Sequence, residues 1–265
     1  MRARTLFAAV GAAGVCLAGS ANLAAQDFEW EGRLAAGRTI EISNINGAIT
    51  ALPGSGDRVQ VEAVKHEGRR GDPADVTIEV VEHEDGVSIC AIFPRQRSSR
   101  GDRYAECGGE EFERPVTGQN DTEVEFTVRV PAGVHFRGHT VNGEVTAEDM
   151  GADAYVHTVN GDVRVSAAGL AEASTVNGSV FASVGRADWR GDLEFSTVNG
   201  SITVELPEGV GAEVTAGTVN GDIETDFPLT VRGRFGPRRL TGTIGDGGRD
   251  LSLSTVNGDI RLRRR

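Results

Sequence analysis

The sequence predicts an all-β protein, a parallel β-solenoid of stacked coils with an N-terminal β cap or further opening coils. The first observation is that the tetrapeptide Thr-Val-Asn-Gly occurs six times in 265 residues. The second is that apolar or small residues alternate with polar residues on both sides of it, as in strands. The third is composition, because 36 glycines and only 5% aromatic residues are untypical of a helical bundle.

Residues 1–25 are expected to form a secretory signal peptide. Arg2 and Arg4 provide a basic start, Leu6–Ala18 is a short apolar run, and small residues up to Ala25 suit cleavage. The apolar run is shorter than the roughly 20 residues that a membrane-spanning helix needs. We therefore expect an exported protein, located in the periplasm, on the outer surface or outside the cell, with no transmembrane segment in the mature chain.

Residues 26–123 are predicted to form an N-terminal β region of short strands. Apolar alternation and intervening turn residues give these segments: Phe28–Trp30, Arg38–Ser43, Ala48–Leu52, Arg58–Val64, Val76–Val81 and Val87–Phe93. Residues 94–120 are expected to form a loop that a disulfide between Cys90 and Cys107 closes. Export favours oxidised thiols, and neither a Cys-x-x-Cys spacing nor a nearby histidine supports a redox or metal pair.

Residues 124–265 carry the strong repeats and are predicted to continue the preceding region as the solenoid. A weaker copy begins at Asn44. The asparagines of the six strong copies are expected to have structural roles: Asn142, Asn160, Asn177, Asn199, Asn220 and Asn257. Stacked coils would place like residues about 4.8 Å apart, where asparagine amides form ladders. The alternative is an antiparallel meander with Asn-Gly hairpins, but the constant register favours stacking.

Two details of the repeat are harder to interpret. The last two asparagines are 37 residues apart, close to two periods, so residues 226–248 are interpreted as an interruption. The threonine and the valine of the repeat cannot both face inward on a regular strand, so a bulge or corner is expected at the turn.

The Thr-Val-Asn-Gly repeats, the Pro-x-Gly-Val corners after Val130 and Leu206 and the export signal together resemble a known family. It is the bacterial "putative adhesin" family of exported β-strand-repeat proteins, whose domain has no assigned function. The resemblance runs from about Thr39 to the C-terminus. It implies a β-solenoid and a role at the surface or envelope, and it transfers no catalytic residue.

His139 and His157 are candidates for two metal ligands, since both stand three residues before a repeat asparagine. In a stack they would be neighbours on adjacent coils, where imidazoles suit transition metals. The next coil has Ser174 at this position, so no third ligand follows. The interpretation that we favour is two exposed histidines and no metal site.

Acidic residues follow the repeat glycine in four copies, namely Glu144, Asp162, Asp222 and Asp259. Such a stripe could cleave a polysaccharide or bind Ca²⁺. Ser179 and Ser201 occupy the stripe between the second and third acids, so Asp162 and Asp222 are expected three coils apart. Glu144 and Asp162 would then be the one adjacent pair.

These observations favour a non-catalytic, exported, adhesin-like interaction module that needs no cofactor and binds an unknown envelope or surface ligand. The formal net charge of −12 argues against nucleic acid as a partner. Two alternatives remain open. One is a polysaccharide-active or calcium-binding β-helix that uses the acidic stripe, and the other is an accessory or sensor protein for envelope stress.

Overall fold

The computed structural model describes residues 28–94, 107, 120–189, 192–231 and 238–265. The expected signal peptide and most of the expected 94–120 loop lie outside these residues. The described chain is all-β, with one short 3₁₀ helix at Pro73–Asp75. Among the described residues, no helix has the length and apolar character that crossing a bilayer requires.

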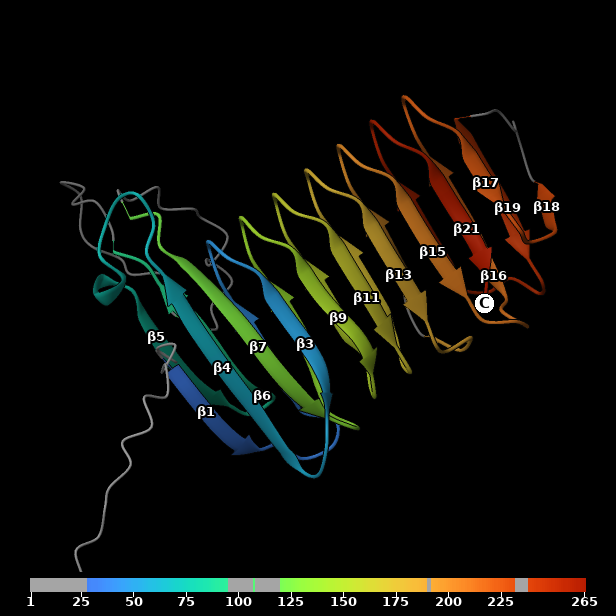
Figure 1. Ribbon diagram of the computed structural model, residues 1–265. Coiled ribbons are helices and arrows are strands. Elements are labelled where there is room, and N and C mark those ends of the chain that lie inside the picture. Colours follow the sequence, from blue (N-terminus) through green and yellow to red (C-terminus); the bar gives the residue numbers. More distant parts are fainter. Residues whose placement is uncertain (1–27, 95–106, 108–119, 190–191, 232–237) are drawn as a thin grey trace, which may run out of the picture.

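The strands form two long, mostly parallel sheets that lie one behind the other (Figure 1). The first sheet contains, in spatial order, β1 (Phe28–Arg33), β4 (Arg58–His66), β7 (Glu123–Pro131), β3 (Ile49–Gly54), β9 (Val145–Met150), β11 (Val163–Ala167), β13 (Val180–Val184), β15 (Ile202–Leu206), β21 (Ile260–Arg264) and β17 (Ile223–Thr225). The second contains β18 (Leu229–Val231), β19 (Arg239–Ile244), β16 (Ala212–Gly217), β20 (Asp250–Ser254), β14 (Asp192–Ser196), β12 (Ala171–Ser174), β10 (Ala154–His157), β8 (His135–His139), β2 (Thr39–Ser43), β6 (Gly86–Ile92) and β5 (Thr77–His83).

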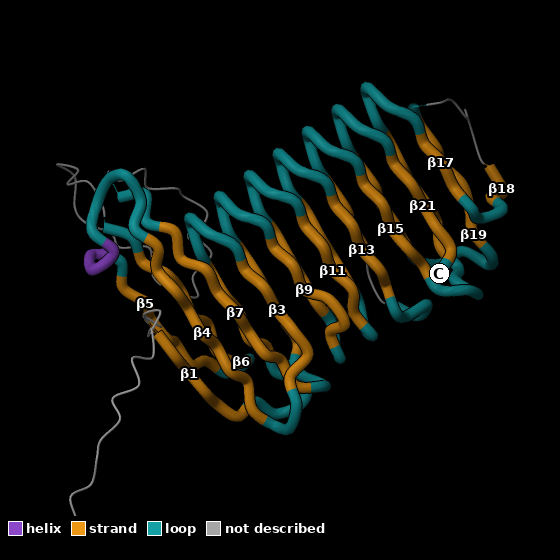
Figure 2. Tube along the Cα trace, in the orientation of Figure 1, coloured by secondary structure: helices purple, strands orange, loops and turns teal. Residues whose placement is uncertain are grey.

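Each Asn-Gly turn connects a strand of the second sheet to the next strand of the first. We call such a unit a rung, and the turns align along one edge of the molecule (Figure 2). The rungs are β2/β3, β8/β9, β10/β11, β12/β13, β14/β15, β20/β21 and β16/β17. The six strands expected before residue 94 are all present, and the β2/β3 rung lies within the stack, between β6/β7 and β8/β9.

The core lies between the sheets, because alternate residues of every rung point inward. Val163, Val180 and Ile202 occupy the same position on neighbouring strands of the first sheet and are buried. Phe136 and Phe195 are buried from the second sheet. The period-two pattern of the repeats therefore directs one face of each sheet to a continuous apolar core.

The order of the last two rungs corrects the expectation of a simple interruption at residues 226–248. The rung of Asn257 lies between those of Asn199 and Asn220, because β20 pairs with both β14 and β16 and β21 with both β15 and β17. Two strands, β18 and β19, form within the supposed interruption, and β19 covers the outer edge of β16 in antiparallel pairing. The chain skips one place in the stack and returns to fill it.

The threonine of each repeat faces inward, whereas the repeat valines Val198, Val219 and Val256 are exposed at the corner and Val141 is buried. Thr158 is fully buried, whereas Val198 is 39% exposed and Val219 55%. The threonine hydroxyl donates to the repeat-glycine carbonyl of the adjacent rung at 2.8–3.2 Å, as from Thr158 to Gly143. The hydroxyl thus satisfies a carbonyl at the corner, which accounts for an inward polar residue.

The asparagines form a second ladder on the exposed side of the same corner. In each neighbouring pair an amide Nδ2 donates to the Oδ1 of the next side chain at 2.7–2.8 Å, from Asn46 at one end to Asn220 at the other. Glycine follows because the backbones approach closely, and a Cβ on Gly161 would overlap the carbonyl oxygen of Gly143. The repeat is therefore occupied in holding rung to rung.

Candidate functional site

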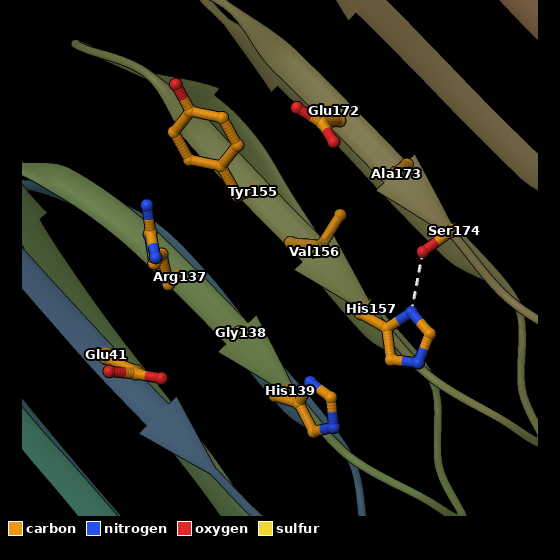
Figure 3. Close-up of a pocket in the computed structure, with 10 residues that line it drawn as sticks. All are labelled: Glu41, Arg137, Gly138, His139, Tyr155, Val156, His157, Glu172, Ala173 and Ser174. Carbon is orange, nitrogen blue, oxygen red and sulfur yellow. Dashed lines mark hydrogen bonds between the residues drawn. The ribbon is translucent and has the colours of Figure 1, made fainter. Parts of the chain in front are cut away.

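A depression of about 390 Å³ lies on the outer face of the second sheet (Figure 3). Strands β2, β8, β10 and β12 form its floor, and their outward residues form its lining. These outward side chains are Glu41, Arg137, His139, Tyr155, His157, Glu172 and Ser174. Strict alternation explains why they point outward, because the residues between them, such as Val156 and Ala173, point into the core.

The two candidate metal ligands lie side by side at one end of the depression. The rings of His139 and His157 stack with centroids 4.8 Å apart and planes at 27°. His157 Nδ1 is 2.6 Å from the Ser174 hydroxyl on the next strand. No cluster of three or more histidine, cysteine or acidic residues suited to a metal occurs in the described part of the chain. The pair offers two ligands where even an open zinc site uses three protein ligands.

Arg137 and Tyr155 form the other end of the depression. The guanidinium carbon of Arg137 is 5.3 Å from the centre of the Tyr155 ring, a cation–π distance. Burial raises the pKa of the Tyr155 hydroxyl, the carboxylates of Asp153 and Glu172 raise it further, and Arg137 opposes them. Tyr155 therefore remains a neutral hydrogen-bonding group across the physiological range.

Glu172 is the acidic group of the depression with a shifted pKa. Partial burial raises the pKa of its carboxyl, the neighbouring carboxylate of Glu194 adds to this, and Arg137 lowers it. Arginine, tyrosine and carboxyl groups together provide donors, an aromatic face and acceptors within one shallow surface. Such a lining suits recognition of a polar partner.

Glu41 belongs to a hydrogen-bond network that the sequence analysis missed. The Ser88 hydroxyl donates to Glu41 at 2.8 Å and is 3.0 Å from His83 Nε2. A serine nucleophile would instead donate to its histidine base, and Ser88 is fully buried. The network joins β2, β5 and β6 and so supports the sheet beneath the depression.

The acidic stripe lies elsewhere, at the turns, and the order of the rungs changes its geometry. After Glu144, the stripe residues follow one another along the stack in the order Asp162, Ser179, Ser201, Asp259 and Asp222. Asp162 and Asp222 are therefore four rungs apart rather than three. Asp259 and Asp222 form a second adjacent pair, which the chain order conceals.

Two of the stripe carboxylates, those of Asp162 and Asp259, have partners on the adjacent rung. Asp162 Oδ1 accepts from the Ser179 amide at 2.8 Å, and Asp259 Oδ1 accepts from the Asp222 amide at 3.1 Å. Asp259 also pairs with Arg261 at 2.7 Å. These carboxylates satisfy amides of the adjacent rung at the turn, as aspartates commonly do in turns.

The two cysteines of the N-terminal region are bonded to each other. Cys90 and Cys107 form a disulfide with their Cα atoms 5.6 Å apart, an ordinary separation for this bond. Cys107 lies against β5 and β6, with its sulfur 3.6 Å from the Ser88 carbonyl oxygen. The disulfide thus fastens Cys107 over the end of the second sheet nearest the depression.

Sequence reasoning selected the histidine pair of the depression but not Arg137, Tyr155 or Glu172. These residues do not repeat, so the search for recurring positions passed over them. The available signal was their common place five residues before the repeat asparagine, on the polar side of the alternation.

Residues 38–263 match the family model described as Toastrack DUF4097. Among solved structures, a "putative cell adhesion protein" from Clostridium sporogenes is similar at 11% identity, covering 90% of this chain and 99% of that chain, with a TM-score of 0.46. A "putative adhesin" from Bacteroides fragilis is similar at 13% identity, covering 89% and 96%, with a TM-score of 0.33. Both scores are low, so neither structure bears on function. No curated protein matches the chain.

Proposed function

Because the chain belongs to the Toastrack DUF4097 family, whose model spans residues 38–263, we propose that it is a scaffold that presents a binding surface. In this proposal the two sheets form one β-solenoid. The mature protein is exported and acts without catalysis as an interaction module of the cell envelope or surface. Its partner binds in the depression on the outer face of the second sheet.

The observation that carries the proposal is that repeated and non-repeated residues have different places: the repeated side chains bond rung to rung, and non-repeated side chains line the depression. The side chains of the repeated threonines and asparagines form hydrogen bonds to neighbouring rungs. The outward residues five positions before the repeat asparagine differ from rung to rung across the depression, and three of them, Arg137, Tyr155 and Glu172, line it. A constant frame with a varied outer face is the arrangement by which repeat proteins present binding surfaces.

The disulfide supports the exported part of the proposal. Disulfides persist in oxidising compartments such as the periplasm and the cell exterior, and they are rare in the cytosol. The bond between Cys90 and Cys107 lies beside the depression, since Cys107 contacts the backbone of β6 and β6 is paired with β2. An oxidising environment would therefore also strengthen the binding face.

The test is retention of the purified mature protein on insoluble cell-wall polymer and on immobilised envelope extract. Arg137→Ala removes a charge from the depression, and Arg164→Ala removes the same charge from the opposite sheet, where Arg164 is exposed. We expect the first variant to lose retention and the second to bind as the wild type does. Equal retention of both variants, or no retention of the wild type, would refute the proposed site.

The absence of catalysis is a separate part of the proposal with its own measurement. A screen for glycan hydrolysis and lyase activity would compare the wild type with Glu144→Gln and Asp162→Asn. We expect no turnover from any of them, since Asp162 is engaged with the next rung. Turnover in the wild type that either substitution abolishes would establish the polysaccharide-active alternative instead.

A further inference from the structure

The chain contains the same hexapeptide, Thr-Val-Asn-Gly-Asp-Ile, at 218–223 and at 255–260. The two copies occupy adjacent rungs but in different settings. The rung of Asn257 has a neighbour on each side, whereas β17, in the rung of Asn220, is the last strand of the first sheet. Identical sequences therefore experience two different structural environments, which isolates the effect of the stack from that of local sequence.

The inner copy is held by hydrogen bonds on both sides. Gly258 donates its amide to the Asn220 carbonyl at 2.9 Å. The side chain of Asn257 donates to Asn199 at 2.7 Å and accepts from Asn220 at 2.8 Å. The backbone amide after Asn257 and both ends of its side-chain amide are thus engaged.

The outer copy has fewer of these bonds. The Asn220 side chain donates to Asn257, but within the described residues its Oδ1 accepts no bond. The amide of Gly221 likewise has no acceptor in the part of the chain that the structure describes, whereas each of the other repeat glycines donates its amide to the asparagine carbonyl of the adjacent rung. Val219, which precedes Asn220, is 55% exposed, more than Val198 or Val256 at 39%.

Asn-Gly is the dipeptide in which an asparagine is most easily deamidated, because glycine has no side chain to hinder the backbone amide that follows the asparagine. The reaction requires that amide nitrogen to reach the asparagine Cγ. A hydrogen bond that holds the amide in the stack opposes this, since the bond must break first. Asn257 meets that obstacle, whereas within the described part of the chain Asn220 does not.

We propose that Asn220 is a site of spontaneous deamidation, selected by its place at the open end of the ladder. The Gly221 nitrogen attacks Cγ of Asn220, a C–N bond forms, and the Cγ–Nδ2 bond breaks. The proton of the Gly221 amide leaves with Nδ2 as ammonia. Water then opens the succinimide ring and gives aspartate or isoaspartate at position 220.

The product removes the Nδ2 donor that Asn220 gives to Asn257 and adds a negative charge. The new carboxylate would lie on the rung that already carries Asp222 and Glu224, and the adjacent rung carries Asp259. Like charges on neighbouring strands repel, so the outermost rung becomes less firmly attached. The fraction of molecules with aspartate or isoaspartate at position 220 would thus increase with time, and the change would lie at one end of the stack.

The rate difference follows from the bonds that must open. Asn257 must give up two more hydrogen bonds than Asn220, that of its following amide and that on its Oδ1. Each bond is worth on the order of a fivefold change in an equilibrium, so two bonds together should make folded Asn220 react about 25-fold faster. In the unfolded chain the identical hexapeptides should react at the same rate.

The experiment is to incubate the full folded protein at mildly alkaline pH and follow each Asn-Gly site by peptide mapping with detection of isoaspartate. A parallel incubation in concentrated urea supplies the unfolded reference. Asn220→Gln serves as a control, because glutamine at this position should abolish the fast reaction while the other sites keep their rates. We expect conversion at Asn220 well ahead of Asn257 in the folded protein and equal conversion of both in urea.

Two results would overturn the proposal. Equal rates at Asn220 and Asn257 in the folded protein, with reaction of both in urea, would show that the end of the ladder confers no reactivity. Asn46 ends the other side of the ladder, but its following amide, that of Gly47, donates to Asn142 at 2.8 Å. Fast conversion of Asn46 would therefore contradict the role assigned to the Gly221 amide, which has no acceptor among the residues that the structure describes.

Discussion

Replacing Asn177 by alanine should destabilise the protein by the value of two ladder hydrogen bonds. Its Nδ2 donates to Asn160 at 2.8 Å, and its Oδ1 accepts from Asn199 at 2.7 Å. The side chain is exposed, so water compensates in part for the lost bonds. At roughly 0.5–1 kcal/mol for each exposed bond, the expected loss in the free energy of unfolding is about 1–2 kcal/mol.

Asn220→Ala is the matched comparison, because Asn220 makes one ladder bond and has the same neighbours in sequence. Its expected loss is about half that of Asn177→Ala, roughly 0.5–1 kcal/mol. Any general effect of alanine at the turn is shared by both variants, so their difference isolates a ladder bond. Urea unfolding of the two variants and the wild type measures it. A loss below about 0.5 kcal/mol for Asn177→Ala, the usual size of a surface substitution, would mean that the amides simply face water.

Three further outcomes follow from the buried and charged groups. Thr175→Val removes a buried hydroxyl that donates to Gly161 at 3.0 Å, so urea unfolding should show a loss of about 1–3 kcal/mol, and an unchanged midpoint would contradict the threonine ladder. Alkylation of the unreduced protein should label neither Cys90 nor Cys107, and Cys107→Ser should cost on the order of 3 kcal/mol, whereas ready labelling would disprove the bond in solution. Burial raises the pKa of Glu172, so the fold disfavours its charged form, and Glu172→Gln should raise the Tm at neutral pH. This gain should vanish as the pH falls below the ordinary pKa range of glutamate, and a Tm gain that persists in acid would refute burial as the cause.

Much of the local structure could be predicted because each repeat carries its own signals. Alternation around Asn160-Gly161 defines two strands and a turn, and identical residues at a constant register predict a ladder. The sequence predicted a corner at the threonine and valine of the repeat, but it did not predict which of the two side chains faces inward. The assignment depends on the Gly143 carbonyl that Thr158 satisfies, which belongs to a different rung.

The order of the rungs could not be predicted, for a definite physical reason. Parallel neighbours meet through long connections, and the rungs that carry Asn220 and Asn257 have the same hexapeptide, so local chemistry does not distinguish their places. The decisive interaction is β19 against the outer edge of β16, which leaves the inner edge for the returning β20. The depression was missed for a different reason: the predicted stacking that places His139 beside His157 also places Arg137 beside Tyr155, but Arg137 and Tyr155 do not repeat and so were not selected.

The rung order is also the central claim about the scaffold, and distances between spin labels test it most directly. Cysteine variants at the exposed valines Val198, Val219 and Val256 would carry the labels in pairs. The structure predicts one rung, about 5 Å of backbone spacing, between positions 198 and 256, and two rungs, about 10 Å, between 198 and 219. Dipolar broadening should therefore be stronger for 198 with 256 than for 198 with 219. The reverse order would show that the rungs follow the chain and would contradict the stack described above.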